Sequence, residues 1–156
     1  MMLRIRRTLA AVFLAAASVG LTACTPSIPS VTWYANGKAV DVGPALYCNI
    51  NATLEPDCPV FNGPVAKLAL RPGDGVQVNI PSGLYDAPWT LVVTYGDESE
   101  RTSITRTEKT YSYVVKPPRG KSITQIDLQV LVPIAGTDGG VEYTPAQLWV
   151  LEVTPA

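Results

Sequence analysis

The chain has 156 residues, with 12 basic and 13 acidic side chains and no histidine. Without histidine, Ser-His-Asp and Cys-His catalysis and zinc sites that need imidazole ligands are excluded. The formal net charge of −1 provides no strongly basic surface for the phosphates of a nucleic acid. The sequence therefore predicts no nucleic-acid partner, no metal site and no other cofactor.

An export signal is predicted at residues 1–23. Three arginines precede an apolar run over residues 9–21, which is the order of regions in a secretory signal peptide. The run is shorter than the roughly 17 to 25 residues of a membrane-spanning helix, so we expect cleavage rather than a permanent span. Arg6 and Arg7 leave a twin-arginine signal open as an alternative to a plain basic region.

Cys24 is predicted to carry lipid. Residues 21–24 read Leu-Thr-Ala-Cys, which resembles the bacterial lipobox, where a diacylglyceryl group is attached to the cysteine thiol before cleavage on its N-terminal side. Three cysteines are an odd number, and lipidation caps the thiol that one disulfide leaves over. We therefore expect a lipid anchor at the extracytoplasmic face of the cell membrane. Ordinary cleavage near Ala23 is the alternative.

The mature chain divides into a tether at residues 24–30 and one domain at residues 31–156. Loss of the three signal arginines leaves nine basic and 13 acidic residues, a net charge of −4. About 130 residues suffice for a single core. The proline-containing tether reaches only about 20 Å when extended, so the domain is expected to stay close to its membrane.

The domain is predicted to be all-β. Apolar residues recur with period two, and 14 prolines and 12 glycines leave no room for long helices. Asn36-Gly37 is a type I′ turn signal between strands at residues 31–35 and 38–42. Further strands are expected at residues 66–70, 76–80, 89–95, 110–115, 124–132 and 147–153. This pattern favours a single immunoglobulin-like antiparallel β-sandwich of about seven or eight strands, with a small barrel as the alternative.

Cys48 and Cys58 are expected to form a disulfide. They stand ten positions apart in a proline-punctuated stretch with little periodic structure. The export signal places them in an oxidising compartment, where such a pair stabilises a small domain. A redox role would favour a Cys-x-x-Cys pair at a helix N-terminus, and neither is present in the pattern.

Several short motifs are spread over most of the mature chain. They are the lipobox, the two cysteines, the turn Arg71-Pro72-Gly73 before residues 76–81, the strand at residues 88–95 and the closing strand around Trp149. Together they resemble an actinobacterial family of lipoproteins and membrane-anchored proteins, domain of unknown function 2771. The resemblance implies no catalytic or binding residues.

Asp97, Glu98 and Glu100 form the densest acidic cluster, within a charged segment at residues 96–109 that we expect to be a solvated loop. A pair of carboxylates there could in principle hydrolyse a glycoside. Calcium binding is a further alternative, but the alternating acids and turn glycine of a calcium loop are missing. No catalytic residue is therefore assigned.

Aromatic residues supply the first candidate binding groups. Trp89 and Trp149 lie within apolar strands and are expected to be buried. Trp33 beside the tether, and Tyr111 and Tyr113 on a shared face, are the candidates for stacking on a sugar or a lipid tail.

Residues 116–121 form a basic loop with Lys116, Arg119 and Lys121, which could contact anionic headgroups or a phosphorylated envelope polymer. A plain solvated turn is the competing interpretation. The favoured function is a non-enzymatic protein-interaction or structural component of the cell envelope. A lipid- or glycan-binding lipoprotein is the alternative, and a hydrolase with two carboxylates is a third.

Overall fold

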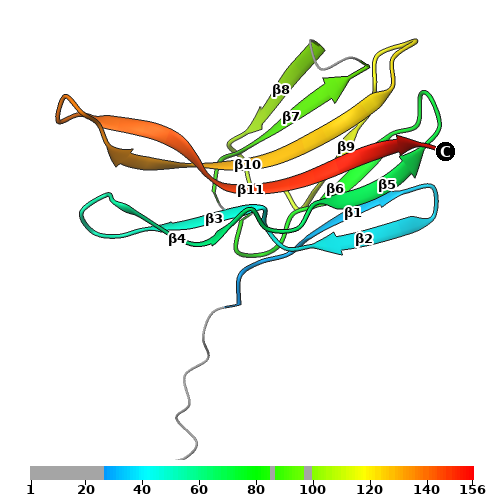
Figure 1. The fold of residues 1–156 in the computed structure, drawn as a ribbon. Helices are drawn as coiled ribbons and strands as arrows, with labels where there is room; N and C mark the ends of the chain where they lie inside the picture. The colour runs from blue at the N-terminus through cyan, green and yellow to red at the C-terminus, as the bar shows by residue number, and fades with distance from the viewer. Residues whose placement is uncertain (1–26, 85–86, 97–99) are drawn as a thin grey trace, which may run out of the picture.

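The computed structural model describes residues 27–84, 87–96 and 100–156 (Figure 1). The predicted signal peptide at residues 1–23, and Cys24, lie outside these residues. Eleven strands occur in the described part, and they form two sheets. Within it, no helix has the length and apolar character needed to cross a membrane. The predicted all-β sandwich is confirmed, although with more strands than the seven or eight expected.

The smaller sheet has four antiparallel strands in the order β2-β1-β6-β9. Its strands are β1 (Val31–Ala35), β2 (Lys38–Val42), β6 (Val76–Asn79) and β9 (Ser112–Val115). Asn36 and Gly37 join β1 to β2 with φ angles of 51° and 75°. Both positive values belong to the type I′ turn that this dipeptide predicts.

The larger sheet has seven strands, six of them in the order β4-β3-β11-β10-β7-β8. Its strands are β3 (Leu46–Ile50), β4 (Pro56–Phe61), β5 (Ala66–Leu70), β7 (Trp89–Tyr95), β8 (Glu100–Arg106), β10 (Ile123–Ala135) and β11 (Val141–Pro155). β11 is the central strand, because β10 pairs along one edge while β3 and β5 share the other. β5 lies parallel to β11, and the other pairs are antiparallel.

The core lies between the two sheets and is filled by large side chains. Trp33 comes from the smaller sheet, and Trp89 and Trp149 come from the larger one; all three are fully buried. Inward-facing valines, leucines and isoleucines of β1, β5, β6, β7, β10 and β11 pack around them. The predicted burial of Trp89 and Trp149 is therefore confirmed. This packing supplies most of the apolar burial that stabilises the domain.

Two segments predicted as irregular are strands. The stretch that holds Cys48 and Cys58, expected to have little periodic structure, forms β3 and β4, which pair with each other. Residues 100–106, expected to belong to a solvated loop, form β8 along β7. Both are edge or near-edge strands, so water solvates much of their length and little apolar alternation remains in the sequence. The residues 97–99, with Asp97 and Glu98, lie outside the described part of the chain.

The strand directions define two ends of the sandwich. The tether end is where the chain enters β1 at Val31, and it also holds the ends of β6 and β7 at Asn79 and Trp89. The far end holds the β1–β2 turn, which is joined to the next loop by a 2.8 Å hydrogen bond from Asn36 Nδ2 to Asp74 Oδ2. The C-terminus lies at this far end as well (Figure 1).

Candidate functional site

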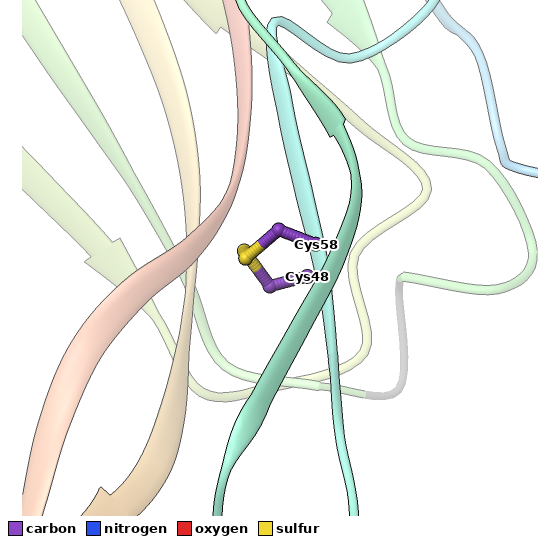
Figure 2. Close-up of a disulfide and its surroundings, with 2 residues drawn as sticks. All are labelled: Cys48 and Cys58. Carbon is purple, nitrogen blue, oxygen red and sulfur yellow. A yellow bond between two sulfur atoms is a disulfide. The ribbon is translucent and has the colours of Figure 1, made fainter.

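Cys48 and Cys58 form the predicted disulfide, with an S–S distance of 2.03 Å. Figure 2 shows both side chains projecting to the same side of the β3–β4 hairpin. The register between the two strands shifts at this point, between Tyr47 and Asn49. The bridge therefore holds the hairpin together where its regular pairing is interrupted.

The β10–β11 hairpin extends well beyond the sandwich. β7 pairs with β10 only as far as Val130, and a bulge on β11 at Ala146 follows. Beyond it, residues 131–145 form a two-stranded ribbon, which projects at the same end as the β3–β4 hairpin (Figure 1). We call the ribbon and the hairpin tip at residues 49–57 together the arm. A bulge bends and twists the strand that carries it, so the bulge on β11 accounts for the change in strand direction where the ribbon leaves the sandwich.

The outer face of the ribbon is entirely apolar. Cross-strand partners share a face of a sheet, so the register identifies its members. They are Leu131, Pro133, Ala135, Val141, Tyr143 and Pro145, and all six are exposed. The exposed fraction reaches 71% for Tyr143, 57% for Val141 and 37% for Leu131. A contiguous apolar surface of this kind is typical of an interaction site.

The inner face of the ribbon is covered by the β3–β4 hairpin. β3 starts on the β11 edge, where Leu46 pairs with Leu148. At the hairpin tip, beyond β3, the chain has reached the β10 edge of the ribbon, where Leu54 O accepts a hydrogen bond from Ala135 N at 3.4 Å. The hairpin therefore crosses beneath the ribbon, and Val132 and Ile134 on the inner face are half-buried. One apolar face of the arm is thus covered and the other is free.

The apolar outer face continues onto the base of the arm. Leu148 pairs with Leu46, which in turn pairs with Phe61, so these three side chains form a row on the same face. Phe61 has an exposed fraction of 70%. We define the arm face as this row together with the six ribbon residues.

Prolines make the ribbon edges poor templates for another strand. Pro133 lies in β10 and Pro145 in β11, each within the ribbon. Proline has no backbone N–H to donate, and it is a common means of blocking strand addition at a sheet edge. Contact through the arm face is therefore favoured over the addition of a strand.

The aromatic candidates of the sequence do not form an exposed platform. Trp33 has no exposed surface, so its prediction as a stacking residue beside the tether is wrong. It alternates inward with Val31 and Ala35 along β1 and packs in the core between the two sheets. Tyr113 packs edge-on against Trp89, with ring centroids 6.2 Å apart, beneath the Arg106 guanidinium. Tyr111 is 62% exposed, and Lys109 Nζ lies 5.9 Å from its ring centroid.

The basic loop with Lys116, Arg119 and Lys121 lies at the far end, because β9 runs toward that end and β10 starts from it. Lys116 and Arg119 are exposed. Lys121 forms an ion pair with Glu100, the described member of the acidic cluster. The loop is therefore at the opposite end of the sandwich from the tether.

Asp127 lies on the outer face of β10 between Val92 and Val150. Burial raises its pKa, while a 2.7 Å hydrogen bond from Gln125 Nε2 and the charge of Arg101 lower it in part. Burial likewise raises the pKa of Tyr95, against the charge of Lys121. Among the described residues no three carboxylates or cysteines converge to hold a metal ion.

Depressions in the described surface are small or open. One of about 120 Å³ is lined by apolar residues at the far end, among them Leu70, Ile123 and Val153. A more open, polar one of about 330 Å³ includes Arg101, Gln125 and Glu152. Glu152 is already paired with Lys67 at 3.0 Å. Neither depression encloses the several hundred Å³ that a lipid tail requires.

Fold and site together define an all-β sandwich with a disulfide-locked arm that exposes an apolar face. The chain belongs to the protein family of unknown function DUF2771, whose family model matches residues 24–154. It is 30% identical over 128 residues to the uncharacterized protein Rv0875c of Mycobacterium tuberculosis and to the uncharacterized protein Mb0899c of Mycobacterium bovis. Each match covers 80% of this chain and 76% of the relative. No solved structure gives a significant match.

The sequence analysis identified the cysteine pair but not the arm face. Two sequence features were a signal for it: residues 131–135 are apolar at every position, and residues 141–145 are apolar at alternate positions. Such a run is indistinguishable from a buried core strand until the register shows that one face has no partner sheet.

Proposed function

We propose that this protein is a lipid-anchored, extracytoplasmic protein-binding domain of the actinobacterial cell envelope, which acts by binding rather than by catalysis. The observation that carries the proposal is the arm face, in which Tyr143 and Phe61 are each about 70% exposed. A monomeric domain rarely leaves such a face uncovered without a partner. Aromatic side chains are also enriched in the energetically important part of protein interfaces.

The membrane location rests on the lipobox-like residues before Cys24 and on a short tether. Pro29 O accepts a 3.1 Å hydrogen bond from Trp149 Nε1, so the tether joins the domain before β1 begins. Residues 24–28 alone then separate the lipid from the domain, a span of at most about 17 Å. The arm, which projects at the tether end, is thereby kept close to the membrane surface.

A protein partner is favoured over a lipid or glycan ligand. A carrier of a lipid tail needs an enclosed apolar cavity, whereas three buried tryptophans fill the space between these sheets. A glycan platform needs exposed aromatic rings side by side, whereas Tyr113 is packed beneath Arg106. The basic loop lies at the opposite end of the sandwich from the tether. This position argues against contact between the loop and the headgroups of the membrane that holds the anchor.

Site-specific photocrosslinking in intact cells tests the binding role. The full-length protein would carry p-benzoylphenylalanine in place of Tyr143, and a matched control would carry it in place of Tyr34. Tyr34 is also exposed but lies on the outer face of the smaller sheet. We expect a discrete protein adduct from position 143 and not from position 34. Adducts in equal yield from both positions, or from neither, would contradict the proposal.

Anchoring is tested separately by Cys24→Ala. Loss of the lipid should release the protein from the membrane fraction and abolish incorporation of labelled palmitate. A Cys24→Ala protein that stays membrane-bound after a high-salt wash would exclude the lipid as its anchor.

A further inference from the structure

The arm carries acidic side chains and no basic ones. Glu55 and Asp57 lie in the hairpin tip at residues 49–57, and Asp138 and Glu142 lie in the ribbon at residues 131–145. All four are exposed. Neither segment contains a lysine or an arginine. Asp138 lies in the turn at the tip of the ribbon, Glu142 pairs with Ile134 on the inner face, and Glu55 and Asp57 lie in the hairpin beneath that face. The arm as a whole is therefore negatively charged, with no cation of its own to neutralise it.

The sandwich itself carries both signs of charge. At the far end Lys121 is paired with Glu100, and Asp74 lies in the loop beside the β1–β2 turn. At the tether end Arg106 pairs with Trp89. The arm, in contrast, carries only negative side chains, and such a field attracts a positively charged partner before contact is made.

We propose that the arm face binds a second protein whose contact surface is apolar at its centre and bordered by lysine or arginine. This inference rests on the proposed function and specifies the chemistry of the partner. The apolar residues of the arm face would supply the dry centre of the interface, and the negative charge of the arm would attract the cations that border the partner's apolar surface. The two prolines direct the partner to the face of the ribbon rather than to its edges.

Charge also argues against the other occupants of this surface. Stacking the arm faces of two copies would bring two negatively charged arms together, and an anionic membrane would repel the arm in the same way. The far end of a second copy carries Asp74 and Glu100 among its basic side chains, so it offers no uniformly cationic border.

The test combines the crosslinker at position 143 with charge reversal. We expect Asp138→Lys with Glu142→Lys to lower the yield of the adduct at least about threefold. Added salt should also lower the adduct yield of the protein that keeps its native charges. Asp138→Asn with Glu142→Gln should give an intermediate loss. Glu108→Lys, an exposed reversal outside the arm, should leave the yield unchanged. Equal thermal unfolding of all variants shows that the fold is retained.

The outcomes separate this inference from the function on which it rests. Mass spectrometry of the adduct should identify a partner peptide from a surface with lysine or arginine beside apolar residues. A protein adduct whose yield is insensitive to arm charge overturns the cationic rim and leaves the binding function standing. An adduct with a second copy or with lipid also overturns it. No adduct at all removes both.

Discussion

Trp149 Nε1 donates a 3.1 Å hydrogen bond to the carbonyl oxygen of Pro29, 120 positions earlier in the chain. Trp149 is fully buried in the central strand of the larger sheet, whereas Pro29 precedes the first strand. Ser30 adds a second attachment through a 3.0 Å bond to Asp41 Oδ2. The core therefore determines where the tether leaves the domain.

Replacement of Trp149 by phenylalanine should release the tether. Trp33 is a matched control, because it is equally buried but its indole N–H has no acceptor among the described residues. Both substitutions leave similar space, so Trp149→Phe should destabilise the domain by about 1 kcal/mol more than Trp33→Phe. Chemical denaturation measures this difference, and limited proteolysis at residues 25–30 should accelerate only in Trp149→Phe. Equal losses of stability in the two variants would show that the hydrogen bond contributes nothing.

Removal of the disulfide should loosen the arm more than the sandwich. Cys48→Ala with Cys58→Ala removes a bridge across ten residues, which is expected to cost somewhat under about 3 kcal/mol. Hydrogen exchange should rise in β3, β4 and residues 131–145 while β7 stays protected. Uniformly faster exchange across both sheets would contradict a local role for the bridge.

Gly63 should tolerate no side chain. A Cβ atom there would lie 2.1 Å from Pro44 O, at the base of the arm where Gly63 N also donates to Ala45 O at 2.8 Å. Gly63→Ala is expected to destabilise the domain by about 1–3 kcal/mol through this clash with backbone. Gly83 has open space around its Cβ position, so Gly83→Ala is the control and should have little effect. A stable Gly63→Ala protein would mean that the chain at the arm base is free to move aside.

Asp127 should make the domain less stable as pH rises. Its pKa is raised in the folded state, so folding favours the protonated form, and this contribution is lost as pH increases from below 3.8 through the folded-state pKa. The substitution Asp127→Asn keeps an oxygen for Gln125 Nε2 without the charge. It should therefore stabilise the protein near neutral pH and make no difference well below pH 3.8. Denaturation curves at several pH values measure this, and equal stability of both proteins near neutral pH would contradict it.

Local signals predicted the sandwich well. The Asn36-Gly37 turn and the alternation in Trp89–Tyr95 depend on residues that are neighbours in sequence, and both are present in the structure. The cysteine pair was predictable because the predicted export signal and the odd cysteine count restrict the possible pairings. These features need no knowledge of which strand lies beside which.

Features that depend on strand pairing could not be predicted. Trp33 is buried because a second sheet covers it, and Tyr143 is exposed because no second layer of the described chain covers the outer face of the ribbon. The local sequence pattern around each of these residues is that of an ordinary strand, so it does not show whether the side chain is buried or exposed. β8 was missed because charged and hydroxyl side chains dominate an edge strand, so that only its pairing with β7 identifies it.

The central strand of the larger sheet comes after all the strands that pair with it in the sequence. β10, β3 and β5 precede β11 (Val141–Pro155), yet all three pair with it. A chain synthesised only as far as β10 therefore has no strand that unites β10 with β3 and β5, and the larger sheet can close only once β11 is available. The hydrophobic core between the two sheets is consequently completed late, by the strand that carries Trp149.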